Sequence, residues 1–134
     1  MTRHLQAMLD SQPRHPSAQD LIARCIAACL DCSAACTGCA DACLAEENVR
    51  HLAACIRLDL DCADLCGATA RVVGRLTRPN KATMAAALQA CIAACQACAA
   101  ECEGHAAMHA HCRVCAEACR DCAEACQDLL DVVP

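Results

Sequence analysis

The sequence lacks phenylalanine, tyrosine and tryptophan altogether, and it contains only four glycines and four prolines. Buried aromatic and branched side chains normally stabilise a fold by about 1.5–3 kcal/mol each, so this chain needs another way to fill its interior. Cysteine is the abundant alternative, at 18 of 134 residues. That share exceeds the ~8–10% at which cysteine becomes the main structural clue. The length suits one folded domain.

Signals for nucleic-acid binding are missing as well. Single strands stack on aromatic rings, and duplexes attract clusters of lysine and arginine that neutralise phosphates. This chain has no such ring, no basic cluster and a formal net charge of −5. We therefore expect no nucleic-acid partner.

Signals for export and for membrane insertion are also missing. Residues 1–10 form no continuous apolar stretch of the kind that a secretory signal needs, and they carry no twin-arginine motif. The one uncharged run long enough to suggest a membrane span, 82–100, is mostly Ala, Cys and Gln and would insert weakly. We expect a cytoplasmic protein with no membrane partner. In that reducing compartment cysteines indicate metal binding or catalysis before disulfides.

The cysteines fall into four groups with a regular spacing. They are Cys25, Cys29, Cys32, Cys36, Cys39 and Cys43; Cys55, Cys62 and Cys66; Cys91, Cys95, Cys98 and Cys102; and Cys112, Cys115, Cys119, Cys122 and Cys126. Within each group the steps alternate between three and four residues, apart from one gap of seven after Cys55. This rhythm places each group on one stripe of an α-helix. A strand would scatter the same residues over both faces.

The stripes predict an all-α fold, an antiparallel up-down-up-down four-helix bundle with cysteines lining the core. We predict helices near residues 18–45, 49–76, 81–103 and 105–130. The connections between them are short, and short connections join antiparallel neighbours. The stripe from Cys25 to Cys43 alone would extend over about 27 Å at 1.5 Å per residue.

The remaining local signals concern the helix starts and the N-terminal segment. Ser17 begins a candidate capping box for the first long helix, and Asn80 is a candidate cap for the third. Leu5, Met8 and Leu9 share a face, so residues 2–11 can form a short additional helix. We divide the chain into an N-terminal segment, 1–16, and the cysteine-rich bundle, 17–134.

Several uses of so many cysteines compete. One or two buried cysteines often serve as small hydrophobes, but eighteen on matched stripes do not fit that role. Disulfides between positions three or four apart would strain helix geometry, and a thiol redox enzyme needs one or two exposed thiols of lowered pKa. An iron–sulfur cluster usually needs a set of four cysteines, and no such set is isolated here. We therefore predict a metal-binding protein that is not an enzyme.

Charge distinguishes the two metals that remain. Each Cu(I) replaces one thiol proton, so an interior filled with about one copper per cysteine stays close to neutral. Zinc held by four thiolates leaves two negative charges per site, which is unfavourable in a low-dielectric interior. Pairs such as Cys25 and Cys29 also supply two sulfurs from one helix, which suits two- or three-coordinate Cu(I). We predict multiple Cu(I) ions, near one per cysteine. A thiol-rich zinc or mixed-metal buffer is the alternative, and an iron–sulfur or thiol redox protein is a more distant one.

From about Ser17 to Val133 the chain resembles the cytosolic copper storage proteins. The resemblance depends on the repeated CxxxC and CxxC stripes, for example Cys25-Ile-Ala-Ala-Cys29-Leu-Asp-Cys32. It implies a cysteine-lined four-helix bundle that holds many Cu(I) ions, assembles as a homotetramer and serves copper storage or detoxification. Which copper chaperone or copper enzyme gives or receives the metal stays open.

Other residues capable of binding copper gather at one end of the predicted bundle, which we call the histidine end. It contains Cys43, Cys55, Cys102 and Cys112 together with His51, His105, Met108, His109 and His111. His51 lies four residues before Cys55, so we expect it to continue the inward stripe. We predict that His51, His105 and His109 bind incoming copper, with Met108 as a further candidate. For His111, copper binding and simple solvation explain the position equally well.

The opposite end contains apolar residues instead, and we call it the apolar end. There Cys25, Cys66, Cys91 and Cys126 are followed outward by Val72, Val73, Met84, Leu88 and Leu129. We predict that these side chains close the apolar end.

Asp59 occupies the position four residues after Cys55, where a cysteine would continue the stripe. It could face water after a small shift of register. It could also act inside the bundle as a carboxylate ligand or proton acceptor. The unbroken spacing to Cys62 favours the second interpretation.

The predicted outer faces combine alanine with larger apolar residues. Those residues are Ile26, Leu30, Leu52, Ile56, Leu60 and Ile92. Exposed apolar patches usually mark a contact with a partner. We predict a homo-oligomer, a tetramer built from two-fold contacts.

Overall fold

Four long helices carry the four cysteine groups in the computed structural model, which describes residues 3–133. They are α2 (Gln19–Leu44), α3 (Ala53–Val73), α4 (Lys81–Glu103) and α5 (Ala110–Leu130). A short helix, α1 (Leu5–Asp10), precedes them, and a 3₁₀ turn, η1 (Val49–Leu52), leads into α3. Residues 3–133 contain no strand, in agreement with the all-α prediction.

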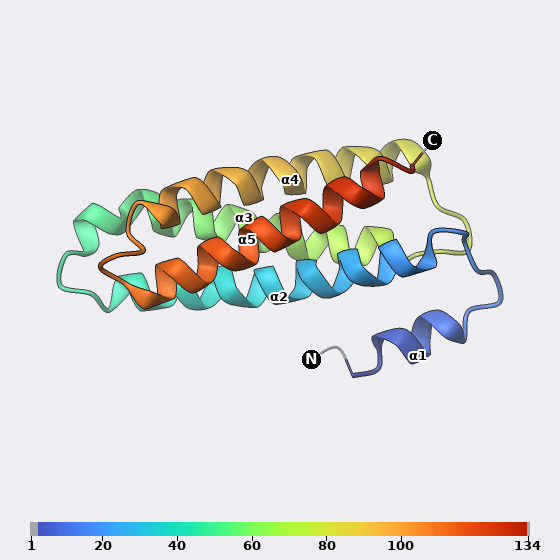
Figure 1. Ribbon diagram of the computed structural model, residues 1–134, viewed down its shortest axis with the longest axis horizontal. Coiled ribbons are helices and arrows are strands. Elements are labelled where there is room, and N and C mark those ends of the chain that lie inside the picture. The colour runs from blue at the N-terminus through green and yellow to red at the C-terminus, as the bar shows by residue number, and fades with distance from the viewer. Residues whose placement is uncertain (1–2, 134) are drawn as a thin grey trace.

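The long helices form the predicted antiparallel bundle. Helix α2 packs against α3 and α5, and α4 packs against the same two helices. In Figure 1 the α2–α3 and α4–α5 connections lie at one end of the molecule, and the α3–α4 connection lies at the other. Each connection is too short to cross the bundle, so successive helices alternate in direction. The up-down-up-down topology is confirmed.

The short N-terminal helix is also confirmed, over a narrower range than 2–11. Helix α1 lies beside α2 in Figure 1, outside the four-helix core. Its Leu9 is buried within the hydrophobic cluster, whereas Met8 is exposed. Leu9, together with the partly buried Leu5, therefore attaches this segment to the bundle.

Two of the predicted helices begin differently from the expectation. The second, predicted from residue 49, starts as the 3₁₀ turn η1, in which the His51 N–H donates to the Asn48 carbonyl at 2.9 Å. The fourth was predicted from residue 105, but residues 105–109 form turns. There the N–H groups of Met108 and His109 donate to the His105 carbonyl at 3.1 and 3.0 Å. The 3₁₀ turn η1 has three residues per turn rather than 3.6, so side-chain directions change at the start of the second helix.

The two predicted caps have opposite outcomes. The Asn80 side chain accepts a hydrogen bond from the Thr83 N–H at 2.9 Å, so this cap of α4 is confirmed. The Ser17 capping box is wrong, because α2 begins after Ala18 without a side-chain cap. The reciprocal bond of a capping box comes from Glu or Gln three residues after the cap, and the residue three positions after Ser17 is the shorter Asp20.

Two helices are long and apolar enough to pass for membrane spans on length and composition alone. They are α2 and α4, of which only α4 contains the uncharged run 82–100. Much of their hydropathy comes from cysteines that are buried inside the bundle. The same property would be found in any core helix of this kind.

The predicted outer-face residues divide into two sets. Leu30 and Leu60 are exposed and Ile56 is half-buried, whereas Ile26 and Ile92 are buried. A helix that contacts two neighbours buries a stripe wider than the a and d positions alone, which explains the two isoleucines. Leu52 is also buried, because the 3₁₀ turn directs it inward.

The Asn80 cap predicts a measurable contribution to stability. Replacing Asn80 with Ala should lower the free energy of unfolding of the metal-free protein by about 1 kcal/mol, because an N–H of α4 loses its partner. Urea unfolding followed by circular dichroism measures this change. Asn48→Ala is the matched control, since Asn48 precedes η1 without a side-chain cap. Equal effects of the two substitutions would contradict the prediction.

Candidate metal centre

All 18 cysteines point into the bundle. None is more than 2% exposed, and every one is a free thiol. A neutral thiol is only weakly polar and packs as a small hydrophobe. The thiols therefore take the place of the aromatic side chains that the sequence lacks.

The sulfurs of different helices lie close together along the whole bundle axis. Cys25 Sγ is 3.7 Å from Cys126 Sγ near the apolar end, and Cys55 Sγ is 3.4 Å from Cys102 Sγ near the histidine end. Two sulfurs bound to one ion at ~2.3 Å in tetrahedral geometry are about 3.8 Å apart. The spacing thus fits thiolate-bound metal ions without a rearrangement of the helices.

Groups of four sulfurs recur along the axis, with the ligand atoms of each group within 4.8 Å of one another. Four of them are Cys29, Cys91, Cys122 and Cys126; Cys32, Cys66, Cys95 and Cys122; Cys32, Cys36, Cys62 and Cys119; and Cys36, Cys98, Cys115 and Cys119. Consecutive groups share members: Cys122 joins the first to the second, and Cys32 joins the second to the third. The thiols therefore form one connected array rather than separate four-cysteine sites.

Asp59 lies within this array and is fully buried. Its Oδ1 accepts hydrogen bonds from the thiols of Cys98 and Cys115 at 3.1 and 3.2 Å. Burial, with a smaller contribution from neighbouring thiolate charge, raises the pKa of Asp59 to about 8. The alternative in which Asp59 faces water is therefore wrong. Its role as a ligand or proton acceptor stays a prediction.

Two thiols at the histidine end, those of Cys43 and Cys112, hold their protons strongly in the absence of metal. Burial raises the pKa of Cys43 to about 11, and the same cause holds the pKa of Cys112 well above its usual range. A metal ion must displace these protons, so uptake releases them to solvent.

His111 is the histidine nearest to the thiols. Its Nδ1 is 3.4 Å from Cys39 Sγ and 3.6 Å from Cys112 Sγ. Together with Cys43 these residues form a group whose ligand atoms all lie within 4.8 Å. For His111 the sequence favoured neither copper binding nor simple solvation. In the structure its ring contacts the thiol array.

His105 and His109 also lie at this end, and each is paired with a carboxylate. His105 Nε2 bonds Glu101 Oε2 at 2.8 Å, and His109 Nδ1 bonds Glu46 Oε2. Both rings are mostly buried. They therefore lie at the predicted end of the bundle, in the outer layer that covers the buried thiols.

Two predicted ligands at the histidine end face solvent instead. His51 is exposed because the 3₁₀ turn directs Leu52 inward in its place, so the expected continuation of the stripe is wrong. Met108 is 79% exposed, because residues 105–109 form turns and the thioether has no helix face to follow. Neither side chain contributes to the buried array.

Glu46 is the functional candidate that the sequence analysis missed. Its Oε2 contacts both His109 Nδ1 and His111 Nε2, the latter at 3.1 Å. A signal for it was present, because Glu46 follows Cys43 by three residues and so continues the spacing of that stripe. Glu46 falls in the connection expected between the helices 18–45 and 49–76, where no helical stripe is predicted, so it was not named as a candidate.

The apolar end is closed, as predicted. Leu88, Leu129 and Val73 are fully buried and Met84 nearly so, whereas Val72 is only half-buried. The histidine end thus carries polar side chains, whereas hydrocarbon side chains and one thioether close the apolar end.

A four-helix bundle whose interior is one connected array of free thiols defines a protein that accommodates many soft metal ions. A model of the copper storage proteins matches residues 18–131. The chain belongs to the copper storage protein family, so copper is the metal that corresponds to this array.

Solved structures agree with this assignment. The copper storage protein Ccsp from Streptomyces lividans, loaded with 10 copper equivalents, is 51% identical with a TM-score of 0.92. That match covers 95% of this chain and 98% of the other. The cytosolic copper storage protein from Streptomyces lividans with five coppers is 56% identical with a TM-score of 0.84, over 86% of this chain and 96% of the other.

A curated relative matches over a shorter stretch. The uncharacterized cysteine-rich protein YhjQ of Bacillus subtilis (strain 168) is 43% identical over 42 residues. This stretch is 31% of the present chain and 39% of the relative.

The buried carboxyl group predicts a pH dependence of stability in the metal-free protein. Asp59 binds a proton in the folded state up to about pH 8, while the unfolded chain releases it near its ordinary pKa of 3.8. Because the folded pKa is the higher one, this contribution to the free energy of unfolding is complete below pH 3.8 and declines as the pH rises toward 8. Asp59→Asn should remove that decline.

Urea unfolding of the metal-free protein across this pH range measures the effect. Asp61→Asn is the matched control, because Asp61 is exposed two positions away on the same helix. The control should retain the slope of the unmodified protein. An unchanged slope in Asp59→Asn would contradict the prediction.

Proposed function

We propose that the protein binds and stores many Cu(I) ions through the thiolates of its 18 cysteines. The observation that carries the proposal is the connected array of buried free thiols, in which neighbouring groups of four share sulfurs. Shared sulfurs suit ions that accept bridging thiolates and two or three ligands each. Because the array offers many similar thiol sites for metal rather than one distinct reactive group, the proposed function is storage and not catalysis.

The charge of the filled interior supports copper over zinc. A Cu(I) ion and the proton that it replaces carry the same charge, so loading leaves the interior near neutrality. Zinc bound to four thiolates leaves two uncompensated negative charges per ion, and no cationic side chain appears among the buried residues of the described chain. Buried charge without a partner is strongly unfavourable.

Residues at the histidine end complete the proposed ligand set. We include His105, His109 and His111, since imidazole binds copper and these rings lie outside the buried thiols. Asp59 is included as a carboxylate that accepts thiol hydrogen bonds within the array. His51 and Met108 are omitted because their side chains face solvent.

An anaerobic titration tests this function. Cu(I) added in competition with a chromogenic chelator should saturate the protein near one ion per cysteine. The accompanying ultraviolet thiolate-to-metal absorption is easy to measure because no aromatic residue absorbs there. Saturation at about four divalent ions per chain would favour the zinc buffer instead. Visible absorption from the purified protein would favour an iron–sulfur protein.

A cytoplasmic location belongs to the same proposal. The Streptomyces lividans relative is described as cytosolic, and a reducing compartment keeps thiols available for metal. Copper is the cargo. We expect a copper chaperone or a copper enzyme as the donor or acceptor, with neither nucleic acid nor membrane as a partner.

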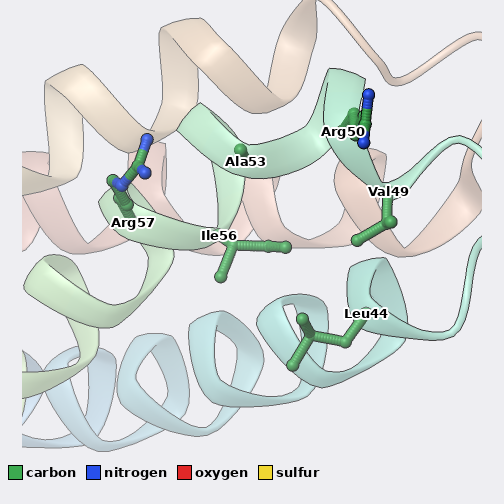
Figure 2. Close-up of a pocket in the computed structure, with 6 residues that line it drawn as sticks. All are labelled: Leu44, Val49, Arg50, Ala53, Ile56 and Arg57. Carbon is green, nitrogen blue, oxygen red and sulfur yellow. The ribbon is translucent and has the colours of Figure 1, made fainter.

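We also propose that the chain forms a homotetramer. Exposed apolar side chains support a protein contact, among them Leu44, Leu30 and Leu60. Figure 2 shows Leu44 of α2 opposite Val49 and Ile56, in a shallow apolar pocket flanked by Arg50 and Arg57. Leu44 is 63% exposed in the single chain, which is an unfavourable position for a large apolar side chain without a partner.

Size-exclusion chromatography with light scattering tests the assembly. The expected mass is about four times the 14.0 kDa of the chain, in keeping with closed symmetric oligomers. Leu44→Glu should reduce that mass if the pocket of Figure 2 lies in an interface, whereas Val132→Glu, at another exposed apolar residue, is the control. A clean monomer of the unmodified protein at micromolar concentration would refute the oligomer.

A further inference from the structure

We propose that Glu46 is a positioning residue that sets the tautomers of His109 and His111, so that each ring presents an unprotonated nitrogen to incoming Cu(I). This inference rests on the proposed function, since it concerns how copper reaches the thiol array. Glu46 itself binds no metal in this scheme. It acts through the two histidines that it contacts.

A single carboxylate oxygen holds both rings. Glu46 Oε2 contacts His109 Nδ1, and it lies 3.1 Å from His111 Nε2. The two rings stack with centroids 5.3 Å apart and an interplanar angle of 27°. A partly exposed glutamate side chain is ionised at neutral pH. The carboxylate therefore stays ionised and accepts from both rings.

The chemistry of the carboxylate determines which nitrogens carry protons. An ionised carboxylate only accepts hydrogen bonds, so each nitrogen that faces it must donate an N–H. A neutral imidazole has one N–H and one lone pair. His109 is thereby protonated on Nδ1 with its lone pair on Nε2, and His111 is protonated on Nε2 with its lone pair on Nδ1.

The lone pair of His111 then faces the thiol array, and the lone pair of His109 is buried without a partner. His111 Nδ1 faces the thiols of Cys39 and Cys112 at 3.4 and 3.6 Å. His109 Nε2 is buried and has no hydrogen-bond partner within residues 3–133. A buried nitrogen without a partner costs free energy, and a metal ion would remove that cost.

Carboxylate–histidine pairing is a general feature of this end of the bundle. His105 also pairs with a carboxylate, Glu101, at 2.8 Å. In many metal sites, one ring nitrogen of a histidine binds the metal and the other donates to a carboxylate, which fixes the orientation of the ring. Loss of such a carboxylate typically weakens metal binding or activity about 10- to 100-fold. Glu46 differs from Glu101 because it holds two rings with one oxygen.

The test compares Glu46→Gln with Glu47→Gln. Glutamine matches glutamate in size, but its amide no longer provides a carboxylate acceptor for both rings. Glu47 is the next residue and is exposed, which makes it a matched control. Circular dichroism of the metal-free variants establishes that both remain folded.

Two measurements report on the proposal. Nitrogen-15 NMR of the metal-free protein at neutral pH should show Nε2–H for His111 and Nδ1–H for His109, and a mixture of tautomers in Glu46→Gln. The initial rate of Cu(I) transfer from a chromogenic chelator complex should fall about tenfold in Glu46→Gln. Glu47→Gln should match the unmodified protein in both measurements.

The outcomes separate this inference from the function on which it rests. If the unmodified protein saturates near one copper per cysteine while Glu46→Gln keeps its tautomers and uptake rate, the role of Glu46 is refuted and copper storage stands. The total copper bound should change little in Glu46→Gln, because all 18 thiols remain. A slower rate without any change of tautomer would also refute the positioning role, since a structural disturbance alone would explain it.

Discussion

Close packing of thiols along a shared axis is the constraint on which the rest of this structure depends. Sulfurs from different helices approach to 3.4–4.0 Å. At this spacing they pack as small apolar groups while protonated, and they can share a metal ion once the protons leave. One set of side chains therefore serves as both hydrophobic core and ligand array. Bulky aromatic residues would interrupt the array, which accounts for their absence from a buried interior of this kind.

The two ends of the axis give this array a direction. Leucines and valines fill the apolar end, and the thioether of Met84 is the one soft group among the side chains that close it. Imidazoles and carboxylates cover the histidine end, where the thiols themselves remain fully buried. In the proposed storage function, metal that enters at the histidine end would meet nitrogen ligands before sulfur. The helix connections determine this difference, because they bring the ends of α2 and α4 beside the starts of η1 and α5.

Asp59 shows how the array tolerates an exception. It replaces one cysteine of the α3 stripe, and its carboxyl group is satisfied by thiol donors rather than by a cation. Burial favours its neutral form at neutral pH. The position therefore changes the chemistry of the array locally, from sulfur to oxygen, without leaving an unpaired charge in the metal-free core.

Much of this protein could be predicted from its sequence because cysteine spacing and helical periodicity are both local properties. The three- and four-residue steps predicted the helices and their inward stripes, the short connections predicted the antiparallel order, and the continuing rhythm placed Asp59 inside. The tertiary structure alone decided which residues at the histidine end reach the thiols. The 3₁₀ turn η1 directs Leu52 inward and leaves His51 exposed, and the turns before α5 expose Met108. Glu46, in the connection after α2, contacts His111 in the first turn of α5. Helical periodicity ends at the helix ends, so contacts there depend on how separate segments pack.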